Sequence, residues 1–141
     1  MSDIIELEAP AAAPQRSSHA KVLVVDDAIT VRLFYRQLLE ETGFVVDEAA
    51  NGLEGLEKLL ADPADLVVVD VNMPKMDGYA MLRALRGEAS VRAVPALMIS
   101  TESQPRDADA AYAAGANFYL TKPVRPEEFL AVVRLMTGTP S

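Results

Sequence analysis

The chain has 141 residues, 50% of them hydrophobic, which suits one ordinary globular domain. Its formal net charge is −8 and it has no Lys- or Arg-rich cluster, which argues against a nucleic-acid partner. It contains no cysteine, which excludes disulfides and thiolate chemistry, and neither a membrane span nor a signal-peptide pattern, so we expect a soluble cytoplasmic protein.

The first 19 residues precede the first patterned strand and are rich in Ala, Pro and Ser, which predicts a disordered N-terminal tail at 1–19. Within it, "IIELE" is a candidate docking motif. The single histidine, His19, also lies there, so a Ser-His-Asp triad, a His-rich zinc site or a phosphohistidine is not expected in the globular part. We expect that part to span 20–137, followed by a C-terminal tail at 138–141.

From Lys21 onward, short apolar runs alternate with segments of helical period. The runs predict five strands, at 21–25, 44–49, 65–70, 95–100 and 117–121. The other segments predict five helices, at 28–42, 52–61, 78–86, 106–114 and 125–136. Two helices carry apolar stripes that we expect to pack in the core. These stripes are Val31, Phe34, Leu38 and Leu39 in the first helix, and Leu53, Leu56, Leu59 and Leu60 in the second.

Strands that are apolar throughout, such as "VLVV" and "LVVV", need cover on both faces, and alternating helices give that cover in a parallel sheet. We therefore predict an α/β fold, a single doubly wound (βα)5 domain with a five-stranded parallel sheet. Ligands bind to such sheets outside the carboxyl ends of the strands, where the strand order reverses.

Four of the predicted strands end in polar side chains. Asp26 and Asp27 follow the first strand and Asp70 ends the third. Ser100 ends the fourth, and Lys122 follows the fifth. If the first and third strands are neighbours, three carboxylates share one crevice. Two like charges about 4 Å apart repel by roughly 4 kcal/mol at an effective dielectric near 20, so the cluster needs a hard divalent cation and a lysine to neutralise it.

Mg²⁺ suits this set, because it takes one or two carboxylates, keeps several waters and accepts phosphate oxygens. A metal-bound phosphate beside a carboxylate points to Asp70 as a nucleophile that forms an aspartyl-phosphate. Lys122 would neutralise the phosphoryl oxygens, and the hydroxyl of Ser100 would donate a hydrogen bond to one of them. Pro74 and Gly78 turn the chain away after Asp70 and leave the crevice open.

Each of these residues also has an ordinary structural explanation. Asp26 and Asp27 are typical helix N-caps. Lys122 alone is typical of a solvated loop, Ser100 of a strand end, and Tyr119 of a half-buried sheet position. Their occurrence together, at the ends of successive strands and in a fixed order, favours a functional site.

The segments "VLVVDDA", "VVVDVNMPKMDG", "LMIS" and "LTKP" together resemble the receiver domain of two-component response regulators, over about residues 21–137. The resemblance implies a flavodoxin-like fold and phosphoryl transfer to Asp70 from a sensor histidine kinase or phosphotransfer protein. It also implies that Asp27 and Asp70 ligate Mg²⁺ directly. By the same resemblance, Asp26 acts mainly through water and Asn72 contributes its backbone carbonyl.

The resemblance assigns further roles around the phosphoryl group. Ser100 and Lys122 would contact it, and the Lys122–Pro123 bond is cis in this family. Tyr119 matches the aromatic switch position, which turns inward as the hydroxyl residue moves toward the phosphate.

Asn72 and Glu102 resemble the stand-alone chemotaxis regulators, at positions that affect the dephosphorylation rate. A chemotaxis-like output and a short-lived phosphoryl state are therefore favoured. The start of the fourth helix, "QPRDADA", has less cationic character than is common in those regulators, and Val124 replaces a frequent Phe.

Only "GTPS" follows residue 137, so we expect the output to pass to an unknown protein at the surface of the fourth helix, fifth strand and fifth helix. We expect a monomer that is no conventional enzyme and catalyses only its own phosphorylation and dephosphorylation. Other interpretations are a phosphate sink, a cell-cycle or stress single-domain regulator, and a non-phosphorylated scaffold. A Mg²⁺-dependent phosphatase of the haloacid dehalogenase type is disfavoured, because Asn72 stands where that family has a second Asp.

Overall fold

The computed structural model describes residues 20–139. The strands are β1 (Lys21–Val25), β2 (Val45–Ala49), β3 (Leu66–Asp70), β4 (Ala96–Ser100) and β5 (Phe118–Thr121). The helices are α3 (Ile29–Glu41), α4 (Gly52–Ala61), α5 (Gly78–Gly87), α6 (Pro105–Ala114) and α7 (Pro126–Thr137). The predicted tail at 1–19, with His19, lies outside the described residues, as does the end of the predicted C-terminal tail.

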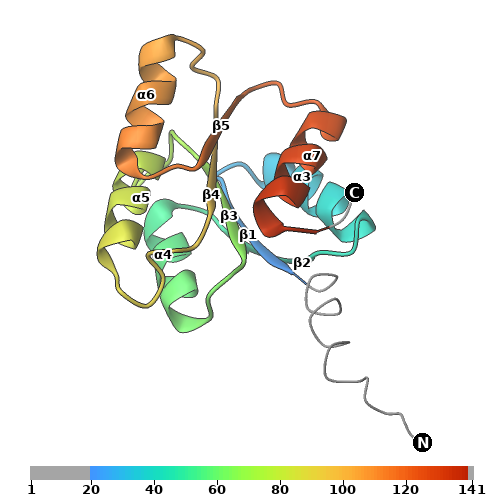
Figure 1. The fold of residues 1–141 in the computed structure, drawn as a ribbon, viewed down its shortest axis with the longest axis horizontal. Coiled ribbons are helices and arrows are strands. Elements are labelled where there is room, and N and C mark those ends of the chain that lie inside the picture. Colours follow the sequence, from blue (N-terminus) through green and yellow to red (C-terminus); the bar gives the residue numbers. More distant parts are fainter. Residues whose placement is uncertain (1–19, 140–141) are drawn as a thin grey trace, which may run out of the picture.

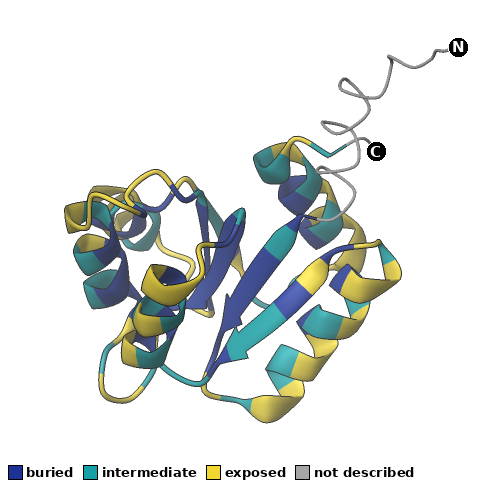
Figure 2. Cartoon of the chain, turned by 90° about the horizontal axis from the view of Figure 1, so that it is seen from below, coloured by how far each residue is buried: buried dark blue, intermediate teal, exposed yellow. Residues whose placement is uncertain are grey.

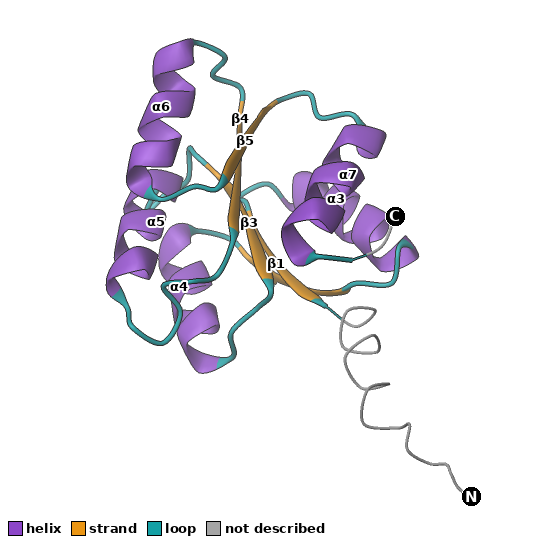
Figure 3. Ribbon diagram, in the orientation of Figure 1, coloured by secondary structure: helices purple, strands orange, loops and turns teal. Residues whose placement is uncertain are grey.

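The five strands form one parallel sheet in the order β2-β1-β3-β4-β5 (Figure 1). Helices α3 and α7 cover one face, and α4, α5 and α6 cover the other (Figure 3). The predicted doubly wound (βα)5 fold is therefore confirmed. The strand order reverses between β1 and β3, where Val25 pairs with Val69. The residues that follow these two strands therefore lie side by side at the carboxyl edge of the sheet.

The centre of the sheet is buried on both faces, as its apolar strands predict (Figure 2). Every residue of β3 and β4 is buried, as are the last four residues of β1. Two apolar clusters flank the sheet, one beneath α4, α5 and α6 and one beneath α3 and α7. No helix in residues 20–139 is both long and apolar enough to cross a membrane.

The predicted core stripe of α3 is wrong at one position. Leu39 is buried, but Phe34 is 43% exposed and its neighbour Tyr35 is buried instead. The Tyr35 ring stacks on Phe129 of α7, with the ring centroids 4.8 Å apart. Helix α3 packs against α7 as well as the sheet, so its buried side is turned toward α7. The periodicity of the α3 sequence alone does not reveal this contact.

The predicted stripe of α4 is also partly wrong, since Leu53 and Leu60 are 43% and 41% exposed. The helix approaches the sheet through a glycine, Gly55. A Cβ atom there would lie 3.0 Å from both Val25 Cγ2 and Met81 Cε. The packed face of α4 therefore includes Gly55 together with the buried Leu59, and leaves Leu53 and Leu60 exposed.

Candidate functional site

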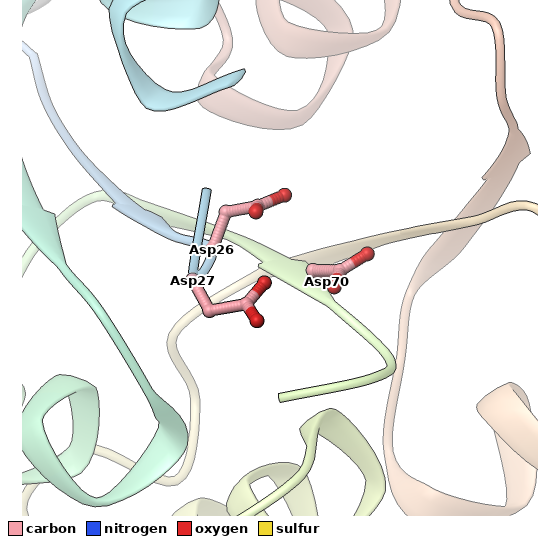
Figure 4. Close-up of side chains that lie close together, drawn as sticks. All are labelled: Asp26, Asp27 and Asp70. Atoms are coloured by element: carbon pink, nitrogen blue, oxygen red, sulfur yellow. The ribbon is translucent and has the colours of Figure 1, made fainter. Parts of the chain in front are cut away.

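Three carboxylates meet at the carboxyl ends of β1 and β3 (Figure 4). One oxygen each from Asp26, Asp27 and Asp70 lies within 4.8 Å of the others. Asp26 is 3% exposed and Asp70 9%, whereas Asp27 is exposed. The structure thus brings together the acidic residues that the sequence placed at two strand ends, because those strands are neighbours in the sheet.

Asp26 is held tightly by its surroundings. Its N–H donates to the carbonyl of Ala49 at 3.1 Å, and its Oδ1 accepts from the N–H of Ala28 at 2.9 Å. Its Oδ2 is buried and accepts no hydrogen bond from the described part of the chain. The N-cap of α3 is Ala28, without a side-chain cap, so neither aspartate of the pair caps this helix.

Lys122 is the cation that faces the acidic cluster. Its Nζ lies 3.0 Å from Asp70 Oδ1 and 3.5 Å from Asp26 Oδ2. Burial raises the pKa of the Asp70 carboxyl above its ordinary value; the neighbouring carboxylates add to this rise, and the hydrogen bond from Lys122 opposes it. Burial lowers the pKa of Lys122, but the two carboxylates outweigh burial and the net pKa is raised. Lys122 therefore pairs with two of the three carboxylates, and among the described residues the cluster carries excess negative charge.

The residues at the predicted switch positions both contact Glu102, in the loop after β4. Ser100 is buried, and its Oγ accepts a hydrogen bond from the N–H of Glu102 at 3.0 Å. Tyr119 is half-buried in β5, and its hydroxyl donates to the carbonyl of Glu102 at 2.6 Å. The N–H of Lys122 donates to the Ser100 carbonyl at 2.7 Å, and the Lys122–Pro123 bond is cis, as the resemblance implied.

The loop after β3 is folded closely against the end of that strand. Gly78 donates its N–H to the carbonyl of Val71 at 2.8 Å. A Cβ atom on Gly78 would lie 2.4 Å from the Asp70 carbonyl oxygen, so only glycine fits. Asn72 is exposed at the start of this loop. The turn holds the backbone of Asp70 in place, and the role of Asn72 as a carbonyl ligand stays a prediction.

The family model described as "Response regulator receiver domain" matches residues 22–134 of the chain. The protein belongs to the response regulator receiver domain family. Chemotaxis protein CheY1 of Helicobacter pylori is 34% identical over 121 residues, which cover 84% of this chain and 98% of that protein. Protein PilG of Pseudomonas aeruginosa is 31% identical over 120 residues, which cover 85% of this chain and 89% of PilG.

Among solved structures, the chemotaxis response regulator CheY4 of Vibrio cholerae is similar to this receiver domain, with a TM-score of 0.80 and 36% sequence identity. The match covers 84% of this chain and 98% of that one. The predicted flavodoxin-like fold and the resemblance to chemotaxis regulators are therefore confirmed. A role in phosphorelay signalling follows from membership of the family.

The receiver domain also has an apolar pocket of about 460 Å³ beside the acidic cluster. Its lining consists of Thr30, Val31, Phe34, Tyr35, Thr101, Lys122, Pro123 and Val124. On the same helix, Ile29 and Leu33 are 64% and 54% exposed. The carboxyl edge of the sheet is therefore bordered by an apolar surface on α3 that is exposed in the described part of the chain.

Sequence reasoning missed one residue that contacts the site of this receiver domain. Arg32 of α3 donates a hydrogen bond from Nη1 to the backbone carbonyl of Asp26 at 2.6 Å. Its Nε lies 2.8 Å from Glu48 Oε1, at the end of β2. The sequence does show an arginine in the helix after the acid pair and a glutamate, Glu48, on the next strand. Whether these side chains contact each other depends on how α3 is rotated about its axis.

Proposed function

We propose that this receiver domain accepts a phosphoryl group on Asp70 from a sensor histidine kinase or phosphotransfer protein. The observation that carries the proposal is the position of Asp70 at the end of β3, with Lys122 Nζ 3.0 Å from its Oδ1 and two further carboxylates in the same cluster. In this step a bond forms between an Asp70 carboxylate oxygen and phosphorus. The bond from phosphorus to the donor nitrogen breaks, and that nitrogen keeps the electron pair.

The residues present fit a bound Mg²⁺ ion. The buried Oδ2 of Asp26 accepts no hydrogen bond from the described residues, and three carboxylate oxygens converge within 4.8 Å against a single ammonium group. Hard carboxylate oxygens with room for water and phosphate oxygens are the surroundings that Mg²⁺ prefers. Asp27 and Asp70 would hold the ion directly, Asp26 mainly through water, and Asn72 through its carbonyl. When bound, the ion supplies positive charge to the phosphoryl oxygens.

The chain's own residues share the work of the transfer. Asp70 is the nucleophile, and the rigid end of β3 orients it. Lys122 neutralises the incoming phosphoryl oxygens, since its ammonium group already lies within hydrogen-bond distance of the acceptor. The hydroxyl of Ser100 donates a hydrogen bond to one of those oxygens. The protein is thus no conventional enzyme and catalyses only its own phosphorylation and dephosphorylation.

We further propose that phosphorylation changes the surface of α6, β5 and α7. Movement of the Ser100 hydroxyl toward the phosphate would release the N–H of Glu102, whose carbonyl holds the Tyr119 hydroxyl. The loop between β4 and α6 would then shift and carry the Glu102 carbonyl away from the Tyr119 hydroxyl, which leaves Tyr119 free to turn inward. A protein partner that gives a chemotaxis-like output binds this surface. The receiver domain itself acts as a monomer in the cytoplasm.

The test is intact-protein mass spectrometry after incubation with acetyl phosphate, with and without Mg²⁺. We expect a Mg²⁺-dependent gain of one phosphoryl group that Asp70→Asn abolishes. Asp109→Asn, at an exposed position of α6, is the matched control and should be labelled like the wild type. Labelling of Asp70→Asn to the wild-type level would refute the acceptor assignment.

The same sample distinguishes a switch from a phosphate sink. Backbone amide NMR signals from α6, β5 and α7 should shift on phosphorylation if the surface changes. Shifts confined to the acidic cluster and its adjoining loops would instead favour a phosphate sink, which removes phosphoryl groups from a kinase without signalling to a partner.

A further inference from the structure

An ionic network joins α3 to the end of β2, outside the acidic cluster. Arg32 and Arg36, one turn apart on α3, each bond to a different oxygen of Glu48. Arg36 also reaches Glu40 through its Nε at 3.0 Å and the carbonyl of Val46 through Nη2 at 2.9 Å. The side chain of Arg32 is 13% exposed and that of Glu48 22%, so this pair is largely shielded from solvent, whereas Arg36 and Glu40 are more exposed.

Arg32 connects this network to the acidic cluster. While its Nε bonds to Glu48, its Nη1 donates to the backbone carbonyl of Asp26 at 2.6 Å. The planar guanidinium presents these donors in a fixed relative geometry, so the carboxylate of Glu48 orients the hydrogen bond to Asp26. Arg36 shares the same carboxylate, but its described hydrogen bonds go to Glu48, Glu40 and Val46.

The carbonyl that Arg32 holds belongs to the peptide group joining Asp26 to Asp27. Two other polar groups of Asp26 are hydrogen-bonded as well, its N–H to Ala49 and its Oδ1 to Ala28. The bond from Arg32 restrains the peptide plane from which Asp27 departs, and the other two bonds restrain the preceding peptide and the side chain of Asp26. They also leave Asp26 Oδ2 facing the cluster, 3.5 Å from Lys122 Nζ.

We propose that Arg32 is a positioning residue for the Mg²⁺ site, which holds the Asp26–Asp27 peptide so that both carboxylates face Asp70. This inference rests on the proposed binding of Mg²⁺ to the acidic cluster. The direction in which Mg²⁺ affinity changes when the Arg32 guanidinium is removed distinguishes a positioning role from simple charge repulsion. As a bare charge, a guanidinium next to the cluster repels a cation, so its removal should tighten Mg²⁺ binding. As a positioning group, its removal should weaken binding.

The experiment compares Arg32→Met with Arg36→Met in the full chain. Mg²⁺ dissociation constants are measured by titration of backbone amide NMR signals, which needs no phosphorylation and reports folding in the same spectra. We expect Arg32→Met to weaken Mg²⁺ binding by about tenfold, the lower end of the loss for groups that support metal ligands. Arg36→Met breaks the same ionic network without touching Asp26, and should change the constant by less than about twofold.

Arg32→Lys provides a second variant should Arg32→Met fail to fold. It keeps the charge, but an ammonium group lacks the fork that serves Glu48 and the Asp26 carbonyl together, so binding should again weaken. Unchanged or tighter Mg²⁺ binding in the Arg32 variants, with normal binding by the wild type, would overturn this inference alone. Equal weakening in Arg36→Met would also overturn it. A wild-type protein that binds no Mg²⁺ would overturn the proposed metal site and this inference together.

Discussion

Asp27→Asn offers a direct test of the acidic cluster, because it removes one charge without removing a side chain from the core. Asp27 is exposed, and its carboxylate lies within 4.8 Å of oxygens of Asp26 and Asp70. At that separation each pair of carboxylates repels by about 0.9 kcal/mol in water and about 3.5 kcal/mol at an effective dielectric of 20. Since Asp27 is exposed to solvent, the lower value applies to each of its two pairs. We expect Asp27→Asn to stabilise the metal-free protein by about 1 to 2 kcal/mol.

Addition of Mg²⁺ should reverse this order of stability. A ligand that binds only the folded state at about 100 times its dissociation constant stabilises that state by about 2.7 kcal/mol. The wild type should gain this amount, whereas Asp27→Asn, with one proposed ligand replaced by a neutral amide, should gain little. The measurement is urea unfolding at neutral pH, first with a chelator and then with saturating Mg²⁺.

The control is again Asp109→Asn, which removes one charge from an exposed position on α6. Its free energy of unfolding should stay within about 0.5 kcal/mol of the wild type, and it should keep the full response to Mg²⁺. A metal-free Asp27→Asn protein that is less stable than the wild type would refute the reasoning about charge repulsion. A variant that gains as much from Mg²⁺ as the wild type would show that Asp27 does not contribute to the metal site.

Three further outcomes are expected. Lys122→Met keeps an unbranched side chain but removes the ammonium group bonded to Asp70. It should slow labelling by acetyl phosphate by about a hundredfold or more, as followed by time-resolved mass spectrometry. An unchanged rate would contradict the role given to Lys122. Burial raises the pKa of Glu48, but the hydrogen bonds from Arg32 and Arg36 outweigh burial and hold this pKa below the ordinary value for a glutamate. The ionised Glu48 therefore stabilises the fold fully at a pH above the ordinary pKa, and this stabilisation is lost as the pH falls through the lowered pKa. Glu48→Gln should therefore destabilise the protein in urea unfolding at pH 7, and the deficit should shrink below about pH 4; a deficit independent of pH would count against the ion pairs. Gly78→Ala should cost about 1 to 3 kcal/mol because its Cβ would meet the Asp70 carbonyl, whereas Gly87→Ala, with nothing within 4 Å, should cost nothing; equal losses in thermal or urea unfolding would argue against the close turn.

Much of the fold followed from features that are local in the sequence. Runs such as "LVVV" fix strands that are buried on both faces, and alternation with helices leads to a parallel sheet. The proximity of Asp26 to Asp70 then follows from the adjacency of β1 and β3, where the strand order reverses. A site built from strand ends is therefore accessible to sequence reasoning, since the backbone topology brings its members together.

Features that depend on helix rotation and close packing were not accessible in this way. Periodicity cannot choose between Phe34 and Tyr35 as the core residue, because the answer depends on α7, far along the chain. It cannot show that Gly55 faces the sheet, because a glycine adds no hydrophobic signal. The bond from Arg32 to the Asp26 carbonyl depends in turn on the rotation of α3 over β2.

The stacking of Tyr35 on Phe129 has a consequence for the protein during its synthesis. The apolar cluster beneath α3 and α7 includes residues of β1 and α3, which leave the ribosome early, and of α7, which leaves last among the described elements. Until Phe129 and Val133 emerge, that side of the nascent sheet lacks its cover, while α4 and α5 can already pack on the other side. Contacts between distant parts of a chain delay folding and leave apolar surface open to association. A truncation before α7 should therefore yield a chain that depends on chaperones, whatever the state of its acidic cluster.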